Sequence, residues 1–264
     1  MSTEISAERR RSGADVSEDA VLGGKLVLRQ PLRGHRFGHD SILLAAAVPA
    51  HADEHAVDLG AGVGAAGLAL ARRVAGATVA LVEIDPMLAA LARDNAGRNG
   101  LTERVRSVCL DVASPPAAFS AAGLEPQSAD HVLMNPPFNA PDNPSPQRGR
   151  RVARAASPET LQRWLRATAR LLRPSGTVTL IWRADGLGDV LKALATGFGA
   201  VALLPVHPKP GTPAVRILAR AVKGRHGAPA LLPGLVLADA EGKPTAEAEA
   251  ILRQGAAVLM AAKQ

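Results

Sequence analysis

Short apolar runs alternate with helical patterns from residue 55 onward. Runs with the length and composition of buried strands are Ala56–Leu59, Thr78–Glu83, Val105–Cys109, Ala129–Met134 and Thr177–Trp182. The segments between them leave room for crossover helices, which a parallel sheet requires. Two further runs, Val201–Val206 and Val215–Val222, have Pro and Gly between them and predict a closing hairpin. The pattern therefore predicts an α/β fold with a mostly parallel sheet.

Two of the connecting segments carry clear helix boundaries. The segment Pro86–Asn99 has a capping aspartate before it, proline at its first position and glycine after its end. A second helix is predicted to begin at Ser157 and to end before Pro174. Near the end of the chain, the apolar segment Leu231–Ala238 precedes an Ala/Glu/Leu-rich pattern that predicts a helix over Thr245–Leu259.

The beginning of the chain and one long loop depart from this regular pattern. Residues 1–20 mix Ser, Glu, Arg and Asp without periodicity, which predicts a disordered leader. The stretch Asn139–Ala156 is rich in Pro and Arg, and irregular stretches of that length are usually functional or disordered. We expect one domain over residues 21–225, including an N-terminal cap segment, and a C-terminal extension over residues 226–264 packed on the same domain.

Composition narrows the class of protein. The chain has 264 residues, 47% of them apolar, which is enough for one sizeable core. The longest stretch without Asp, Glu, Lys or Arg is Ala193–Pro208, which is shorter than the roughly 18 apolar residues of a membrane span. The first twenty residues lack the apolar stretch of a signal peptide, and the lone Cys109 cannot form an internal disulfide. We expect a cytoplasmic protein that makes no membrane contact.

Most of the net charge of +7 lies in one window of the chain. Between Asp142 and Arg173, eight arginines stand against two acids, so this window contributes +6. Guanidinium forks suit phosphate oxygens, which favours a nucleic acid partner, although a solvated helix face after a loop is the alternative. The candidate RNA-binding residues in the loop are Arg148, Arg150, Arg151 and Arg154. The remaining four arginines of the window are Arg163, Arg166, Arg170 and Arg173, which belong to the predicted helix or its end.

The run Val57–Gly64 leads from the first predicted strand into a helix. Its glycines, among them Gly60 and Gly62, let the backbone approach a ligand that lies across the end of the strand. The run Gly62–Gly67 also satisfies the dinucleotide pattern G-x-G-x-x-G, so a nicotinamide-dependent dehydrogenase remains an alternative. Asp58 argues against it, because a carboxylate there would repel a pyrophosphate and favour a cationic ligand such as S-adenosylmethionine.

Residues after the next two strands complete a nucleoside pocket. Glu83 ends the second strand, where a carboxylate can accept hydrogen bonds from both hydroxyls of a ribose. Ile84 beside it can cover one face of an adenine. Asp111 and Val112 follow the third strand, and Asp111 can accept a bond from the exocyclic amine of the adenine or simply cap its own loop.

The sequence Asn135-Pro136-Pro137-Phe138 stands at the end of the fourth strand. Its prolines lack N–H groups, so the turn offers oxygen acceptors without competing backbone donors. A flat amino group fits between the side-chain oxygen of Asn135 and the carbonyl of Pro136, while Phe138 can stack on a planar base. A structural turn with a core phenylalanine is the alternative.

Together these motifs resemble the class I S-adenosylmethionine-dependent methyltransferases, in particular the Asn-Pro-Pro-aromatic group that methylates planar amino nitrogens. The upstream segment Gln30–Ala45 is similar to that of the bacterial tRNA1(Val) adenine-N6 methyltransferase family. The resemblance spans roughly residues 22–255 and includes Arg173–Gly176 and Arg216–Leu218. In two respects the chain departs from the family: Phe138 replaces a frequent tyrosine, and the sequence after it is unusually rich in Pro and Arg.

The resemblance implies a Rossmann-like fold with a mostly parallel seven-stranded sheet, helices on both faces and an antiparallel last strand. It implies S-adenosylmethionine as cofactor and adenine N6 of a tRNA, next to the anticodon, as acceptor. The residues implied to hold the methionine side, ribose and adenine of the cofactor are Asp58, Gly60, Gly62, Glu83 and Asp111. Gln30 and Asp40 would close over the methionine end, although Asp40 alternatively caps a helix over Ser41–Ala47.

The implied catalytic residues are Asn135, Pro136 and Phe138, and Asn135 is also implied to contact the cofactor. Asparagine is not a strong base. Directing both N–H bonds of the acceptor toward oxygens instead raises the electron density on its nitrogen, and orientation of this kind can lower a barrier by about 7–11 kcal/mol. A base inside structured RNA must first be unstacked, which phosphate contacts from the arginine segment can offset.

Other acceptors and other classes of protein remain open. A glutamine amide of a protein and guanine N2 of ribosomal RNA present the same NH2 plane, and a non-catalytic nucleotide-binding protein could retain the fold. We expect no metal, because His35 and His39 stand beside glycines and no further ligand is suitably spaced. Trp164 and Trp182 are assigned to the core rather than to base stacking.

Overall fold

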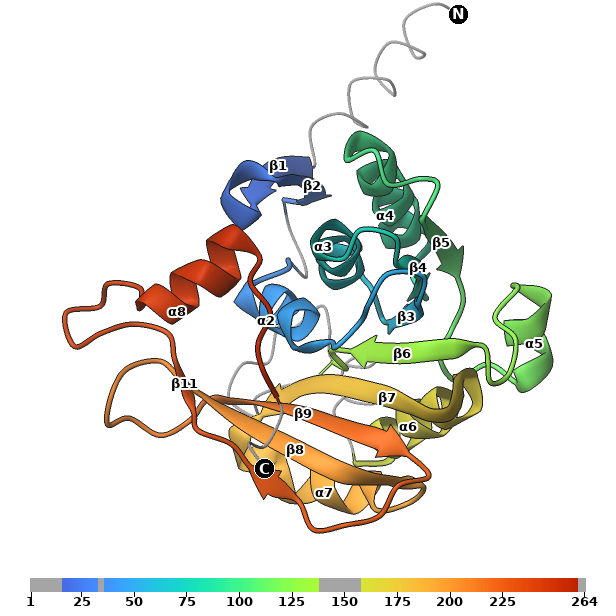
Figure 1. Cartoon of the computed structure of the whole chain (residues 1–264). Helices are drawn as coiled ribbons and strands as arrows, with labels where there is room; N and C mark the ends of the chain where they lie inside the picture. Colours follow the sequence, from blue (N-terminus) through green and yellow to red (C-terminus); the bar gives the residue numbers. More distant parts are fainter. Residues whose placement is uncertain (1–15, 33–35, 138–157, 261–264) are drawn as a thin grey trace, which may run out of the picture.

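In the part of the chain that the computed structural model describes, residues 16–32, 36–137 and 158–260, nine strands form one twisted sheet (Figure 1). They are β3 His55–Leu59, β4 Thr78–Glu83, β5 Val105–Cys109, β6 Ala129–Met134, β7 Leu172–Arg183, β8 Phe198–His207, β9 Arg216–Lys223, β10 Ala230–Leu231 and β11 Leu235–Val236. The spatial order is β10-β8-β9-β7-β6-β3-β4-β5, and β11 also pairs with β8.

This topology confirms the predicted sheet. Neighbouring strands from β5 across to β7 are parallel, and β9 runs antiparallel to both β7 and β8. The predicted closing hairpin is therefore the pair β8–β9. The two-residue strands β10 and β11 were not expected. They pair in parallel with β8 and occupy backbone groups that an edge strand would otherwise leave open.

The strand order reverses at β3, which lies between β4 and β6. In open α/β sheets, ligands bind beyond the carboxyl ends of the strands at such a reversal, because the loops there leave in opposite directions. The turns that follow β3 and β6 are the glycine motif and the Asn-Pro-Pro motif, so the topology brings both predicted motifs to one crevice.

Helices cover both faces of the sheet (Figure 1). Those packed in the first apolar cluster are α2 His39–Ala47, α3 Ala65–Arg73 and α4 Pro86–Arg98. Those packed in the second are α5 Pro116–Ala121, α6 Pro158–Leu171 and α7 Leu187–Leu194. The strands alternate between the two clusters: Val79 and Leu81 of β4 face the first, and Ala80 and Val82 face the second. This alternation explains why a central strand such as β4 is buried on both of its faces.

The predicted signals for α4 are confirmed. The carboxylate of Asp85 accepts from the N–H of Met87 at 2.9 Å, and Pro86 occupies the first position of the helix. The helix ends at Arg98, one residue earlier than expected.

The predicted leader reaches too far into the chain. Residues Val16–Val21 form β1, which pairs antiparallel with β2, Leu26–Pro31. The charged residues that suggested disorder are paired: Glu18 contacts Arg98 at 3.2 Å, and Asp19 contacts Arg36 at 3.0 Å. The remainder of the leader, residues 1–15, lies outside the described residues.

The last predicted helix is also shorter than expected. Thr245 caps α8, Ala246–Glu249, and a π-helical turn over Ala250–Gln254 ends at Gly255, whose φ is +79°. Beyond it the chain is not helical, and the N–H of Val258 donates to the carbonyl of Ala46 at 2.8 Å. A left-handed glycine and packing against α2 therefore end the helix before Leu259.

The described helices include none with both the length and the hydropathy needed to cross a bilayer. The predicted loop at 139–156 and the RNA-binding candidates Arg148, Arg150, Arg151 and Arg154 lie outside the described residues, as does Phe138.

Candidate active site

The glycine turn after β3 is held against the end of β4. The N–H groups of Gly60 and Ala61 both donate to the carbonyl of Val82, at 2.8 and 3.0 Å. Gly60 has a φ of +72°, and a Cβ added there would overlap the ring of Trp164 in α6. Glycine is therefore required at this position for both its backbone conformation and the close approach of α6. Trp164 packs against the second apolar cluster, in line with its assignment to the core.

Close packing of α3 against β4 brings a backbone N–H group to the carboxylate of Asp58. A Cβ at Gly67 would overlap Leu81, and without one the N–H of Gly67 lies 2.9 Å from Oδ2 of Asp58. The side chain of Asp58 is 2% exposed. Burial raises the pKa of Asp58 to about 7; the bond from Gly67 lowers it and the charge of Glu83 adds to the increase. Added positive charge in the crevice would therefore favour the ionised form.

Glu83 joins the glycine turn to the start of α4. Its Oε2 accepts from the N–H of Gly62 at 2.8 Å, and its Oε1 accepts from the N–H of Asp85 at 2.9 Å. The carboxylate is buried, so these bonds fix the direction of both oxygens. Each oxygen keeps acceptor capacity for a further donor, as a ribose diol would require.

Apolar side chains lie close to this carboxylate along the chain. Ile84 is 58% exposed although it follows a buried strand, and Met87 is 56% exposed. Val112 is buried in the second apolar cluster. Asp111 is exposed, and its Oδ1 accepts from the N–H of Ala113 at 2.8 Å, so this aspartate caps its own loop. That bond leaves Oδ2 available to a ligand.

Asn135 is half-buried and faces the glycine turn. It lines a small cavity of about 40 Å³ together with Asp58 and Gly60, and Phe37 and Ser41 lie on the same cavity. The structure thus brings Asn135 to the crevice where the sequence placed it. Pro136 is buried and Pro137 exposed, which directs the turn outward.

Gln30 and Asp40 lie outside the lining of this crevice. Oδ2 of Asp40 accepts from Nε of Arg216 in β9 at 2.8 Å, so α2 is tied to the last strand. Asp40 does not cap the helix either, because α2 begins after Gly38 and has no side-chain cap. A buried Gln30 amide joins two segments instead: Nε2 donates to Asp19 at 2.7 Å, and Oε1 accepts from the N–H of Phe37 at 3.1 Å.

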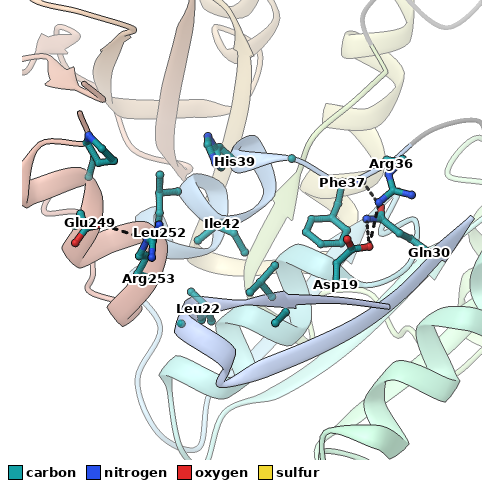
Figure 2. Close-up of a pocket in the computed structure, with 16 residues that line it drawn as sticks. Asp19, Leu22, Gln30, Arg36, Phe37, His39, Ile42, Glu249, Leu252 and Arg253 are labelled. Atoms are coloured by element: carbon teal, nitrogen blue, oxygen red, sulfur yellow. Dashed lines mark hydrogen bonds and ion pairs between the residues drawn. The ribbon is translucent and has the colours of Figure 1, made fainter. Parts of the chain in front are cut away.

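Phe37 was not identified from the sequence, although it is one of only six aromatic residues. It lines the small crevice and also a larger cavity of about 680 Å³ between the β1–β2 hairpin, the start of α2 and α8. Figure 2 shows Phe37 beside Asp19, Gln30 and Arg36, with α8 across the cavity. The pKa of the Asp19 carboxyl lies below its usual value, and the hydrogen bond from the Gln30 amide is the largest cause. Gln30 of the hairpin thus holds the backbone of a residue that lines both cavities.

Within the residues described, no three His, Cys, Asp or Glu side chains gather in a way that could hold a metal ion.

Comparison with known proteins gives one family and several relatives. The model of the methyltransferase small domain matches residues 35–205. A tRNA1(Val) (adenine(37)-N6)-methyltransferase of Porphyromonas gingivalis is 33% identical over 165 residues, which cover 61% of this chain and 64% of that protein. A protein of the same name from Bacteroides thetaiotaomicron is 29% identical over 69% of this chain and 75% of its own length.

A solved structure shares the fold over most of the chain. The predicted O-methyltransferase Atu636 from Agrobacterium tumefaciens aligns with a TM-score of 0.71 and 28% identity, covering 83% of this chain and 98% of that one. The alignment with the Porphyromonas relative covers less than two thirds of that protein, so the activity in its name belongs to a longer chain than the matched part.

Proposed function

Because this chain belongs to the methyltransferase small domain family, we propose that it methylates adenine N6 of a tRNA next to the anticodon. It is a methyltransferase with a Rossmann-like class I fold, and S-adenosylmethionine is its cofactor. One observation carries the proposal: Asn135, followed by two prolines, lines the same crevice as Asp58 and Gly60.

The residues of the crevice fit this cofactor. A Cβ added at Gly62 would meet no atom within 4 Å, so the space in front of the turn is open. Buried Asp58 would favour the cationic ammonium, and Glu83 presents two oriented oxygens to the ribose hydroxyls. Ile84 would lose its exposure by covering the adenine, beside Val112. When bound, the cofactor supplies an electrophilic methyl group on a positively charged sulfur.

Asn135 and Pro136 would orient the acceptor nitrogen. The side-chain oxygen of Asn135 and the carbonyl of Pro136 each accept one N–H of the flat amino group. This geometry directs the nitrogen lone pair away from the ring, so no strong base is needed before transfer. Within the described part of the chain, the side-chain amide of Asn135 makes no hydrogen bond, so its oxygen is available to the acceptor. The proton leaves the nitrogen to solvent after the methyl group has been transferred.

Two observations favour tRNA over other NH2-bearing acceptors. The relatives described above are named as tRNA adenine-N6 enzymes. In addition, the window from Asp142 to Arg173 contributes +6 of the net charge of +7. A glutamine amide of a protein would not need such a charge.

Labelled S-adenosylmethionine tests the acceptor. The protein is incubated with total tRNA, ribosomal RNA or protein extract, and we expect label only in the tRNA fraction. Nuclease digestion and mass spectrometry should then identify N6-methyladenosine. Label in a protein fraction, or N2-methylguanosine in ribosomal RNA, would contradict the proposed substrate while leaving the methyltransferase assignment intact.

Replacing the asparagine tests the proposed mechanism. Asn135→Ala is expected to lower the transfer rate about 100-fold or more, because the acceptor loses its orientation, while the affinity for S-adenosylmethionine changes little. Asn135→Asp keeps an acceptor oxygen and should retain part of the activity. Unchanged turnover in Asn135→Ala would refute the assigned role.

A further inference from the structure

Helix α6 exposes a row of arginines on the side opposite its apolar contacts. Arg163, Arg166 and Arg170 are spaced by three and four residues, which places them on one face of the helix. All three are exposed, whereas Leu161 and Leu165 on the other side are buried. The row spans about 10 Å along the helix axis, enough to meet more than one phosphate of a nucleic acid strand.

These three arginines have no ion-pair partner among the described residues. Over the residues that the structure covers, no carboxylate lies within ion-pair distance of any of them. Arg173, at the end of the same window, contrasts with them because it contacts Asp130 at 2.7 Å. Arg98 of α4 is also paired, with Glu18 at 3.2 Å and Asp94 at 2.9 Å. Helix α6 therefore presents three arginines in one row without a carboxylate partner in the described part of the chain.

A groove lies beside this row, between α6 and α7. Its volume is about 410 Å³, and no acidic side chain lines it. The lining residues are Gln162, Leu165, Arg166, Ala169 and Arg170 of α6, with Ala193 and Thr196 of the α7 region. The large exposed apolar side chains of the described chain all lie on other elements. Because Arg166 and Arg170 line the groove and no carboxylate of the described residues opposes them, the groove is suited to an anionic ligand.

Arg170 is held in place without losing its charge. Its guanidinium carbon lies 5.7 Å from the centroid of the Phe119 ring, and Phe119 is buried in the second apolar cluster. A guanidinium stacked on a ring keeps its edge donors for other groups. Part of the entropic cost of ordering a phosphate-binding arginine is thereby met before the ligand arrives.

We propose that the exposed face of α6, formed by Arg163, Arg166 and Arg170, binds the phosphodiester backbone of the substrate RNA outside the catalytic crevice. This inference rests on the proposed function. Trp164, next to Arg163 in the chain, packs beneath Gly60 and so fixes α6 relative to the glycine turn. RNA bound on this face would therefore be positioned with respect to the target base in the crevice.

A charge-removal experiment tests the surface. The variant with Arg163→Gln, Arg166→Gln and Arg170→Gln is compared with wild type in binding a fluorescein-labelled, unmodified tRNA(Val) transcript across a range of KCl concentrations. We expect binding to weaken about tenfold or more, and the slope of log Kd against log salt to fall by about two to three. The affinity for S-adenosylmethionine, measured by calorimetry, should not change.

A matched control removes the same charge elsewhere. Arg93, Arg225 and Lys243 are exposed and lie on α4, after β9 and before α8. Changing these three to Gln should leave tRNA affinity within about twofold of wild type, because phosphate contacts rather than net charge decide it. Replacing the α6 arginines by Lys instead should restore most of the salt dependence, and this variant also guards against a folding defect.

The outcomes separate the surface from the function. If wild type methylates tRNA and the Gln variant binds it with an unchanged Kd and salt slope, the surface is wrong and the function stands. If tRNA binding weakens equally in the Gln variant and in the matched control, the proposed binding surface is also wrong. If wild type neither binds nor methylates the tRNA transcript, both proposals fail.

Discussion

At the scale of single residues, the crevice combines two buried carboxylates with backbone donors. Asp58 accepts from Gly67, and Glu83 accepts from Gly62 and Asp85. Burial and the negative charge of Glu83 both disfavour ionisation of Asp58. A cationic ligand in the crevice would relieve this unfavourable energy. Asp58 and Glu83 therefore act together in favouring a cationic ligand in the crevice.

Cofactor affinity should depend on pH through Asp58. The pKa of Asp58 in the free protein is raised to about 7, and a bound cation would lower it, so affinity should increase as pH rises through about 7. Titration calorimetry between pH 6 and 8 should show a loss approaching tenfold per pH unit below this value. Asp58→Asn should flatten the profile. A flat wild-type profile would contradict the assignment.

The raised pKa of Asp58 affects the stability of the free protein in the opposite direction: stability decreases as pH rises, whereas cofactor affinity increases. The folded-state pKa of Asp58 lies above its unfolded value of about 3.9, so the folded protein binds more protons between those values. The stabilisation is complete below the unfolded pKa and is lost as pH rises toward 7. The difference in unfolding free energy between wild type and Asp58→Asn should follow this course in urea titrations at pH 4–8.

Gln30 is expected to act on the cofactor through Phe37. Gln30→Ala leaves the N–H of Phe37 without its acceptor and removes a donor from Asp19, at a cost of about 1–3 kcal/mol in unfolding free energy. The affinity for S-adenosylmethionine should fall severalfold because Phe37 lines the crevice. Gln30→Glu keeps the acceptor but faces Asp19, so it should be at least as damaging. Wild-type affinity in both variants would show that Gln30 has no positioning role.

At the scale of elements, α4 completes the open edge of β2. The amide of Asn99 donates to the carbonyl of Val27 and accepts from its N–H, and Asn95 makes the same pair of bonds with Arg29. The two asparagines lie one turn apart and so face the same strand. A two-stranded hairpin is marginal by itself, and these bonds attach it to the domain.

Asn95→Ala should therefore loosen the hairpin. Asn95 is fully buried and also donates to Val63, so the variant leaves several buried backbone groups unpaired and should lose about 2–4 kcal/mol of stability. Asn99→Ala, at a half-buried position, should lose about 1 kcal/mol. Urea unfolding and hydrogen exchange at the amides of Val27 and Arg29 measure these effects. Equal losses in the two variants would contradict this ranking.

At the scale of the whole molecule, the β1–β2 hairpin and α8, which are far apart in the sequence, lie side by side next to α2 (Figure 1). Lys25 donates to the carbonyl of Gln254 at 3.0 Å, and a Cβ at Gly23 would lie 2.8 Å from the carbonyl oxygen of Arg253. The hairpin and α8 thus form the walls of the 680 Å³ cavity beside the crevice. Ligand binding in the crevice should stabilise the domain as a unit.

Saturating cofactor should raise the melting temperature selectively. At one hundred times its Kd, S-adenosylmethionine adds about 2.7 kcal/mol of stability, or roughly 5–10 °C for a protein of this size. NAD at the same concentration should have no effect, because Asp58 disfavours a pyrophosphate. Differential scanning fluorimetry compares the two ligands. An increase with NAD and none with S-adenosylmethionine would favour the dehydrogenase alternative.

Several features were predictable because their signals are local. Strand β4 and helix α4 follow from an apolar run and from Asp85 and Pro86, which lie next to the residues they organise. The meeting of Asn135 with Gly60 was also predictable, since the carboxyl ends of adjacent parallel strands share one edge of the sheet.

The amino-acid sequence by itself determined the α/β order, the glycine turn and the placement of Asn135, because each depends on residues close together in the chain or on a general rule of parallel sheets. Only the tertiary structure decided the partners of Gln30 and Asp40, the part played by Phe37, and which arginines stay unpaired. Those contacts join segments as distant as Asp40 and Arg216, and hydrophobic periodicity carries no information about which distant polar groups meet.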